Sequence, residues 1–514
     1  MGKTWQWLCD GILYNQRNIA NNQGLILSVE ELQNLTLLEI EKLLQRNRRS
    51  LRDYPPMPYP MGYVTSQLGN IMIYDELNYD AIELKENFNL LFQSLTGISK
   101  YQVRDRTTHS KFKIHVPSLE NSICNIHQGS ELAELLKQTK LIIWDEAPMS
   151  HKFCFEALDK SLADIMGTTT NESIIFGGKV VVFCGDFRQI LPVIPIGCRS
   201  DILHATINSS YLWHECRILN LTKNMRLQND DNATEIRDFS KWILKVGDGK
   251  LSEPNDGCVE VDIPEELLIL HFDNSIKAIV SSTYLDLQLH YNDKQFLQCR
   301  AILASTIDIV HQINEYVLSI IPGEEKEYLS SDSLDISDVN DIEAVNILTP
   351  EFINTLSTSG LPNHKIKLKV RIPIMLLRNL DQSEGLCNGT RLVVTKMANH
   401  VLEAKIVSCK NVGHIIYIHR MSISPSQTPW SFKLIRRQFP IFVSYVMTIN
   451  KSQGQSLESV GLYLPKLVFS HGQLYVTISI VKSKKELKIL IHDKDGNPLK
   501  STTNVVYKEV FQNL

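Results

Sequence analysis

The stretch KLIIWDEAPMS, residues 140–150, decides what kind of fold this chain should have. Its apolar run LIIW has no polar alternation, which is typical of a short strand buried on both faces of a parallel sheet. The run stops on Asp145 and Glu146, and ligands of open α/β sheets bind at the carboxyl ends of the strands. Asp145 could therefore hold Mg²⁺ through its water shell, and Glu146 could orient or deprotonate an attacking water. A strand that ends in a solvated acidic turn is the simpler alternative.

A second strand of the same kind lies in GGKVVVFCGDFRQILPVIP, residues 177–195. It ends at Gly185 and Asp186, which we assign to the cofactor-binding edge, because glycine permits a tight exit from the strand. Gln189 is a neutral donor and acceptor that suits the reading of a γ-phosphate. Further on, LNLTKNMRL (219–227) ends on Arg226, whose guanidinium can fork onto phosphate oxygens.

The rest of the chain alternates short strands with helical patterns, which indicates an α/β fold. Residues 1–52 have helical spacing, and the prolines of 54–60 form a linker. The acidic, Ser-rich stretch 324–343 is typical of an exposed loop, and the alternating pattern of 386–437 predicts a small antiparallel β insertion.

Composition limits the class of protein to an ordinary globular one, with 43% hydrophobic residues and a net charge of −4. No apolar run is long enough to span a membrane and no secretory signal is evident, so we expect an intracellular protein. The ten cysteines are scattered, which fits buried thiols in a reducing compartment. Basic clusters at 45–52, 433–438 and 482–488 could follow phosphates or could be solvated surface.

Five motifs in order make the chain recognisable. They are LIIWDEAPMS, VVVFCGDFRQILPVIP, LTKNMRL, PIMLLRNLDQSEGLCNGTRL and MTINKSQGQSLESVGLYL. In this order they resemble the petite-integration-frequency (PIF-like) class of superfamily 1 ATP-dependent DNA helicases, closest to the helicase region of Helitron transposon proteins. The resemblance covers nearly the whole chain.

The resemblance implies two RecA-like P-loop NTPase motor domains that use ATP and Mg²⁺ and act on single-stranded DNA or duplex junctions, with 5′-to-3′ translocation and nuclear location. It makes Asp145 and Glu146 the Walker B pair, Gln189 the γ-phosphate sensor and Arg226 a phosphate-contacting arginine. The expected divisions are a helical N-terminal region (1–96), an incomplete first motor domain (97–230), a second motor domain (231–385 and 438–498), a small SH3-like β insertion (386–437) and a C-terminal tail (499–514).

The same resemblance places the DNA strand on two segments. RTTHSKF (106–112) resembles a strand-binding segment and implicates Thr107, His109 and Ser110, although a single histidine is more often structural. The second segment would link the DNA to the nucleotide cleft, and its polar side chains and flexible glycine suit contacts that do not depend on base sequence. It comprises Lys451, Ser452, Gln453, Gly454, Gln455 and Ser456. A polar turn is the alternative for this second segment.

One element of such a motor is missing. The phosphate loop G-x-x-x-x-G-K should lie between LLFQSLT (90–96) and RTTHSKF, but only the nine residues GISKYQVRD separate them. Gly2-Lys3-Thr4 is the only Gly-Lys-Thr and has no strand before it, so we interpret it as a decoy. Ile480 stands where the family carries an arginine that reaches the transition state.

Three hypotheses therefore remain open from the sequence. The chain could be a working DNA helicase, an inactive transposon-derived remnant that binds single-stranded DNA, or an incomplete gene model of an active enzyme that lost a segment near Lys100 and Tyr101. A structural role that needs no nucleotide is a further alternative. The sequence leaves open the oligomeric state and whether a nuclease domain originally preceded Met1.

Overall fold

The computed structural model describes residues 108–168, 174–221, 233–251, 257–335 and 349–512, together with Leu37. Short gaps in the last range are 359, 382–384, 408–411, 426–431, 456, 466–467 and 469. The expected N-terminal helices, the proline linker, the Gly2-Lys3-Thr4 sequence, Thr107, Arg226 and Ser456 lie outside the described residues.

The chain divides into two compact units, residues 1–102 with 126–141 and residues 103–125 with 142–514. In the first unit the structure describes one helix, α7 (Glu131–Gln138). The Ser130 side chain caps it by accepting a hydrogen bond from the Ala133 N–H, which satisfies one of the unpaired donors of a helix start. All further description concerns the second unit.

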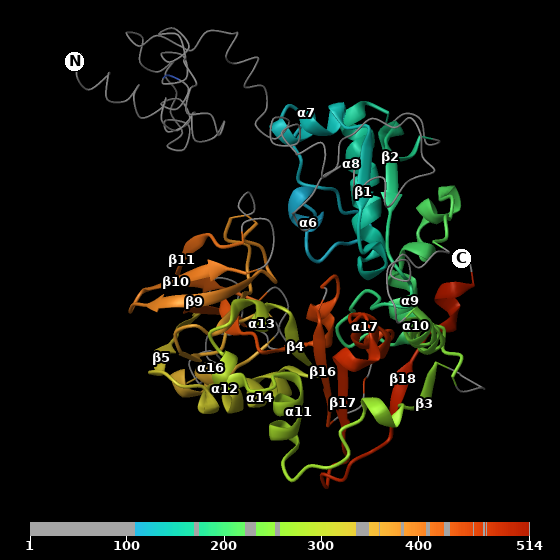
Figure 1. Ribbon diagram of the computed structural model, residues 1–514. Coiled ribbons are helices and arrows are strands. Elements are labelled where there is room, and N and C mark those ends of the chain that lie inside the picture. Colours follow the sequence, from blue (N-terminus) through green and yellow to red (C-terminus); the bar gives the residue numbers. More distant parts are fainter. Residues whose placement is uncertain are drawn as a thin grey trace, which may run out of the picture. The chain divides into compact units, whose positions relative to one another are not determined.

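The region that carries the acidic motifs has a two-stranded sheet, β1 (Leu141–Trp144) and β2 (Val180–Phe183) (Figure 1). Trp144 packs against Phe155 of helix α8 (Lys152–Met166), with ring centroids 4.4 Å apart. Strand β2 is only partly covered, and Val180 is 51% exposed. Helices α6 (Thr108–Lys111) and α9 (Arg199–Ala205) also lie in this region, together with short 3-10 helices.

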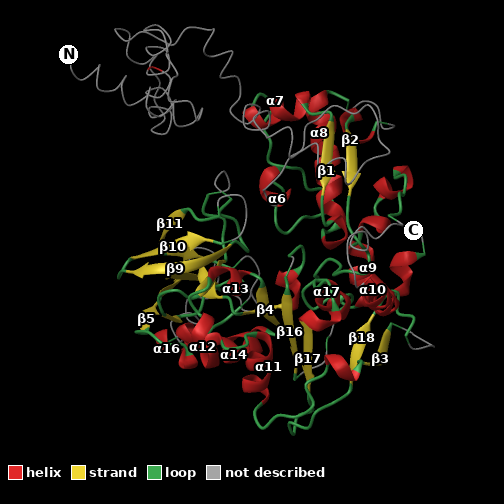
Figure 2. Cartoon of the chain, in the orientation of Figure 1, coloured by secondary structure: helices red, strands yellow, loops and turns green. Residues whose placement is uncertain are grey.

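The C-terminal half contains a four-stranded parallel sheet in the order β15-β4-β16-β17. Its strands are buried almost throughout, as the unbroken apolar run of β4 predicts. Ile302 and Ala304 face one apolar core with helices α11 and α14, whereas Ala301 and Leu303 face a second core with α10 and α17 (Figure 2). The elements are α10 (Ala233–Gly247), α11 (Ser275–Thr283), α12 (Leu287–His290), α13 (Lys294–Gln298), β4 (Arg300–Ala304), α14 (Ile307–Ile320), β15 (Val446–Thr448), β16 (Ser459–Leu464), α17 (Gln473–Ser479) and β17 (Leu487–Ile491).

Between α14 and β15 the chain forms antiparallel sheets. One has the strand order β11-β10-β9-β8-β14, the second β12-β13-β6, and the third pairs β5 with β7. The elements are β5 (Lys326–Leu329), β6 (Ser331–Asp335), α16 (Pro350–Thr355), β7 (Lys365–Leu368), β8 (Pro373–Leu376), β9 (Arg391–Met397), β10 (Val401–Ile406), β11 (Ile415–His419), β12 (Met421–Ile423), β13 (Lys433–Gln438) and β14 (Ile441–Val443). Antiparallel pairing thus extends on both sides of residues 386–437, and the exact domain boundaries stay a prediction.

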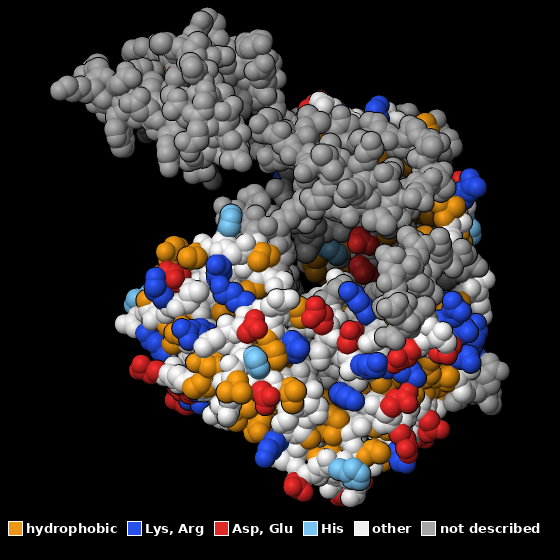
Figure 3. Space-filling view, viewed as in Figure 1, with side chains coloured by type: hydrophobic (Ala, Val, Ile, Leu, Met, Phe, Trp, Pro, Cys, Tyr) orange, Lys and Arg blue, Asp and Glu red, His pale blue; other side chains and the backbone are white. Residues whose placement is uncertain are grey.

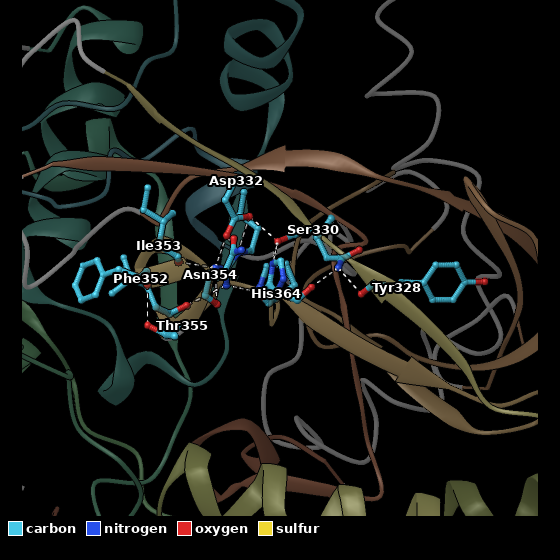
Figure 4. Close-up of polar contacts among 12 residues, drawn as sticks. Tyr328, Ser330, Asp332, Phe352, Ile353, Asn354, Thr355 and His364 are labelled. Atoms are coloured by element: carbon cyan, nitrogen blue, oxygen red, sulfur yellow. Dashed lines mark hydrogen bonds and ion pairs between the residues drawn. The ribbon is translucent and has the colours of Figure 1, made fainter. Parts of the chain in front are cut away.

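Two expectations about local segments were wrong. The acidic stretch 324–343 is not a loop at its start, because β5 and β6 lie there. The basic cluster 433–438 is not a uniformly solvated surface, because Lys433 and Arg437 are exposed but Arg436 is fully buried. The Arg436 guanidinium forms an ion pair with Asp332 of β6, which is also buried, at 2.6 Å between Nη2 and Oδ2 (Figure 4). The acid on β6 and the base on β13 therefore form an ion pair with each other in the interior.

The cysteines are less buried than expected. Among the described ones, Cys124 and Cys154 are buried, whereas Cys198 and Cys258 are exposed, and all are free thiols. In the described part of the chain, no helix has the length and apolar character needed to cross a membrane.

The last residues are a structural element of the second unit. Strand β18 (Ser501–Val505) pairs antiparallel with β3 (Cys258–Asp262). The short helix that follows (Lys508–Phe511) places Val510 in a small apolar cluster with Leu191. The segment that we assigned as a C-terminal tail therefore links the parallel-sheet region to the loop after β2.

Candidate functional site

The acidic motifs meet where β1 and β2 end. The Cys184 N–H donates to the Trp144 carbonyl at 2.8 Å, and the Ala147 N–H donates to the Cys184 carbonyl at 2.9 Å. Gly185 is required here, because an added Cβ would lie 2.3 Å from Cδ of Pro148. Asp145, Glu146 and Asp186 therefore share one edge of this sheet, as the sequence predicts for strand ends.

Glu146 has the most distinctive geometry of the three acids. Its backbone lies in the left-handed region, with φ 52° and ψ 38°, which is uncommon for a residue with a side chain and points to a functional constraint. Its Oε2 atom accepts a hydrogen bond from Nε2 of Gln453 at 2.8 Å. The partly buried acid is thus held by a residue that lies 307 positions later in the chain.

The electrostatics of Glu146 follow from this position. Burial raises the pKa of its carboxyl group, the Gln453 hydrogen bond lowers it, and the charges of Asp145 and Asp186 raise it further. A carboxylate with a raised pKa is a better proton acceptor near neutral pH than an ordinary glutamate. Asp145 beside it is exposed and accepts the Glu146 N–H at 3.0 Å. The exposed Asp145 is accessible to a hydrated cation, whereas the partly buried Glu146 suits proton transfer.

Asp186 is held by protein donors on both of its oxygens. Oδ1 accepts from Nη1 of Arg188 at 3.1 Å, and Oδ2 accepts from the hydroxyl of Tyr475, on α17, at 2.6 Å. Arg188 also binds Asp248 through Nε at 2.6 Å. Burial alone would lower the pKa of Arg188, but the two carboxylates raise it. Asp186 therefore organises the loop after β2 and joins it to α17.

Gln189 lies in the same loop, and its Oε1 atom is buried without a hydrogen-bond partner among the described residues. An unpaired buried acceptor is costly unless a water or ligand supplies the donor. The loop is also packed tightly against the start of α17, because a Cβ on Gly472 would lie 2.4 Å from the Gln189 carbonyl oxygen. This packing fixes the position of Gln189.

The predicted DNA segment after β15 is held largely by its own contacts. Ser452 is fully buried, and its hydroxyl donates a hydrogen bond to the Ile449 carbonyl at 2.7 Å rather than facing solvent. Lys451 lies with Nζ 4.9 Å from the Phe442 ring centroid, and burial lowers its pKa. The Gln455 amide donates to the Lys451 carbonyl at 3.1 Å. Gly454 adopts φ 73° beside Glu146, so the segment turns toward the acidic edge.

The segment around His109 lies elsewhere in the unit. Its Nε2 is 3.3 Å from the Cys154 sulfur on α8, and burial lowers the pKa of the imidazole. Ser110 is on the same short helix, α6. These contacts agree with the structural interpretation of His109, and its role in DNA binding stays a prediction.

Sequence reasoning missed the partners that hold the site. Tyr475 and Arg188 were not singled out, and Gln453 was assigned only to DNA. His471 was missed as well: it is fully buried, its Nδ1 accepts the Tyr507 N–H at 2.8 Å, and Nε2 lies 2.7 Å from the Phe187 carbonyl. No periodic pattern marks Gln453, Tyr475 or His471, because their partners lie in distant parts of the chain. Arg188 is two residues from Asp186, but it also binds the distant Asp248.

Comparison with known proteins agrees with the order of motifs. A family model described as PIF1-like helicase matches residues 72–257, and a model of the DNA helicase Pif1 2B domain matches residues 351–397. The chain is related to the PIF1-like helicases.

Individual relatives extend the match. The ATP-dependent DNA helicase PIF1 of Homo sapiens is 30% identical over 356 residues, which is 68% of this chain and 46% of that protein. The PIF1 helicase of Xenopus laevis is 25% identical over 69% of this chain and 47% of its own length. The chain thus spans about half the length of these relatives. The Pif1 helicase of Campylobacter jejuni is 26% identical over 80% of this chain and 86% of its own length.

Solved structures support the fold. A crystal structure of Bacteroides Pif1 bound to ssDNA has a TM-score of 0.51 and 19% identity, and the match covers 74% of this chain and 78% of that one. A Bacteroides Pif1 helicase in complex with ADP-AlF3 and ssDNA has a TM-score of 0.51 and 19% identity, with coverage of 78% and 80%. The predicted α/β class with two RecA-like domains is confirmed.

Proposed function

We propose that the chain descends from an ATP-dependent DNA helicase of the PIF1 and Helitron type, and that it now binds single-stranded DNA without turning over ATP. The observation that carries this proposal is the hydrogen bond between Glu146 and Gln453. It joins the acid to which we assign water activation to the segment that resembles a DNA contact, which supports a retained link between the strand and the nucleotide cleft.

The described residues fit one half of an ATP site. Asp145 is accessible to Mg²⁺ through water, Glu146 could hold or take a proton, and Gln189 offers a buried, unpaired oxygen. Bound ATP and Mg²⁺ would supply the transferable phosphoryl group and the charge that stabilises its departure. The described residues contain no glycine-rich loop that could grip the β- and γ-phosphates, and the sequence offers only nine residues where that loop belongs.

The environment of Ile480 also argues against turnover. Its side chain is 8% exposed and belongs to the apolar core beneath α17, together with Ile478 and Val481. An arginine in trans or across a cleft contributes about 10³–10⁵ in rate to phosphoryl transfer. A buried isoleucine supplies no charge, so this chain lacks that contribution at the position where the family carries it.

A second candidate is an active helicase whose transcript contains an additional segment between Lys100 and Tyr101. The well-formed acidic edge favours it, since Glu146, Asp186 and Gln189 are all held in specific positions. Sequencing of the transcript across this junction tests it. For either candidate we propose nuclear location and a DNA substrate of the kind met in repair, recombination or telomere maintenance, with 5′-to-3′ polarity in an active form.

The deciding experiment is ATP hydrolysis by the purified chain, with and without single-stranded DNA, beside Glu146→Gln. We expect turnover equal to that of Glu146→Gln in both conditions, while fluorescence anisotropy shows binding of the labelled strand. Turnover that DNA stimulates and Glu146→Gln abolishes would show that another segment grips the phosphates. Absence of both turnover and DNA binding in a folded protein would leave only a structural role.

A further inference from the structure

We propose that the antiparallel sheets between α14 and β15 carry a phosphate-binding pocket separate from the acidic edge. The pocket has a volume of about 490 Å³ and is lined by Ser331, His400, His419, Arg420 and Arg437. Two arginines, two histidines and a hydroxyl line it, and no carboxylate does. Lys and Arg side chains are visible over the part of the surface that carries β9–β11 (Figure 3).

Strand pairing explains why these residues converge. In the β6–β13 pair, Arg437 is opposite Ser331, and Arg436 is opposite Asp332. Side chains alternate between faces of a strand, so Arg436 and Asp332 point inward while Arg437 and Ser331 point outward. Asp332 therefore pairs with Arg436 on the buried face, and the outward Arg437 lacks an acidic partner among the described residues.

The other side of the pocket comes from the neighbouring sheet. His419 ends β11 and is paired with Val401 of β10, which brings the preceding His400 to the same end of that hairpin. Arg420 follows directly and joins the two sheets. Lys326 lies close by, because its Nζ donates to the Asn399 side-chain oxygen at 2.9 Å, and so adds a further positive charge beside the pocket.

Arg420 is held rigidly rather than extended into solvent. Its guanidinium carbon lies 5.1 Å from the Phe439 ring centroid and 5.8 Å from that of Tyr328, and Nη1 donates to the Leu329 carbonyl. Its Nε atom is buried and has no hydrogen-bond partner among the described residues. A fixed, stacked guanidinium loses little conformational entropy when it binds an anion.

The chemistry of the pocket favours phosphate. Guanidinium groups donate paired hydrogen bonds to phosphate oxygens, and imidazole and hydroxyl groups can add single ones. The phosphate could belong to a nucleic-acid strand or to a free anion, and the two sources are separable by experiment. The inference needs neither ATP turnover nor DNA binding at the acidic edge, so it can fail or succeed independently of the proposed function.

The test uses the full chain with Arg437→Gln and His419→Gln combined, because both side chains are exposed and neither carries the stacked core of the pocket. The matched control combines Lys277→Gln and His271→Gln, which removes an exposed lysine and an exposed histidine from outside these sheets. Circular dichroism of both variants verifies the fold.

Binding of pyrophosphate by calorimetry is the first measurement. We expect the pocket variant to bind pyrophosphate about tenfold more weakly than wild type, because the loss of one charge-assisted hydrogen bond weakens binding by about that factor. The control should bind pyrophosphate as tightly as wild type does. Binding of labelled oligo(dT) at several salt concentrations follows. A salt slope reduced by about 0.7 in the pocket variant alone identifies the source as a strand, and an unchanged slope identifies it as a free phosphate. Equal pyrophosphate affinity in wild type and pocket variant would overturn the proposal.

Discussion

Removal of the Asp332 carboxylate should destabilise the sheet that contains β6 and β13 by about 3–5 kcal/mol, the usual cost of leaving one partner of a buried ion pair alone. Both side chains are inaccessible, at 0% for Arg436 and 2% for Asp332. Nε of Arg436 donates to Asp332 at 2.9 Å, Nη1 donates to the carbonyls of Leu356 and Pro362, and Nη2 donates to Asp332 and the carbonyl of Ile353 (Figure 4).

The magnitude follows from which contacts survive in Asp332→Ala. The carbonyls of Leu356, Pro362, Ile353 and Asn354 would still accept hydrogen bonds, but no negative charge would compensate the buried guanidinium. The upper end of the range therefore applies when no water enters the space left by the carboxylate. Glu327→Ala is the matched control on the adjacent strand β5, because Glu327 pairs with Lys365 at the surface, where the side chains are 40% and 51% exposed. An exposed pair of this kind contributes at most about 1 kcal/mol.

Hydrogen exchange detected by mass spectrometry is the suitable assay, because a chain of several domains need not unfold in two states. Exchange of peptides that cover 326–335 and 433–438, measured over a urea series, gives the free energy of local opening. We expect Asp332→Ala to lower it far more than Glu327→Ala does. Equal effects of the two substitutions would refute the reasoning that Arg436 depends on a buried counter-charge.

Three further predictions concern the acidic edge and its supports. Burial raises the pKa of Glu146, so ionisation of this side chain destabilises the fold above its folded-state pKa and has no effect on stability below its unfolded-state pKa. Glu146→Gln should therefore raise the thermal midpoint at pH 8, and this gain should disappear by about pH 4. An equal gain at both pH values would contradict this. Burial lowers the pKa of His471 to about 4, so the fold requires the neutral imidazole and the stability of the wild type should fall as pH drops from 6.5 toward 4. His471→Gln should have a lower thermal midpoint that changes less with pH over this range. Parallel plots of thermal midpoint against pH for the two proteins would show that another group is responsible. Finally, amides of the partly exposed strand β2 should exchange faster than those of the buried strand β16, and slower exchange in β2 would contradict the inference that its partial exposure lowers its local stability.

Much of the fold could be predicted because it rests on local patterns. The apolar run LIIW of β1 indicated a buried strand, and the acids after it indicated a ligand edge, since both features depend on neighbours in sequence. The acidic stretch that contains Asp332 misled for the same reason. Its composition is that of an exposed loop, and only the pairing of β6 with β13 reveals that the carboxylate faces a buried arginine.

The sequence by itself determined the α/β class, the family relationship, the acidic strand ends and the absence of a recognisable phosphate loop, because each of these is written in contiguous residues. Tertiary structure alone decided that Gln453 binds Glu146, that Tyr475 holds Asp186, that Arg188 binds Asp248, and that Arg436 is buried while Arg437 is exposed. These contacts join residues that are tens to hundreds of positions apart or depend on strand register. A one-residue shift of register would exchange the buried and exposed arginines, and no local pattern encodes that choice.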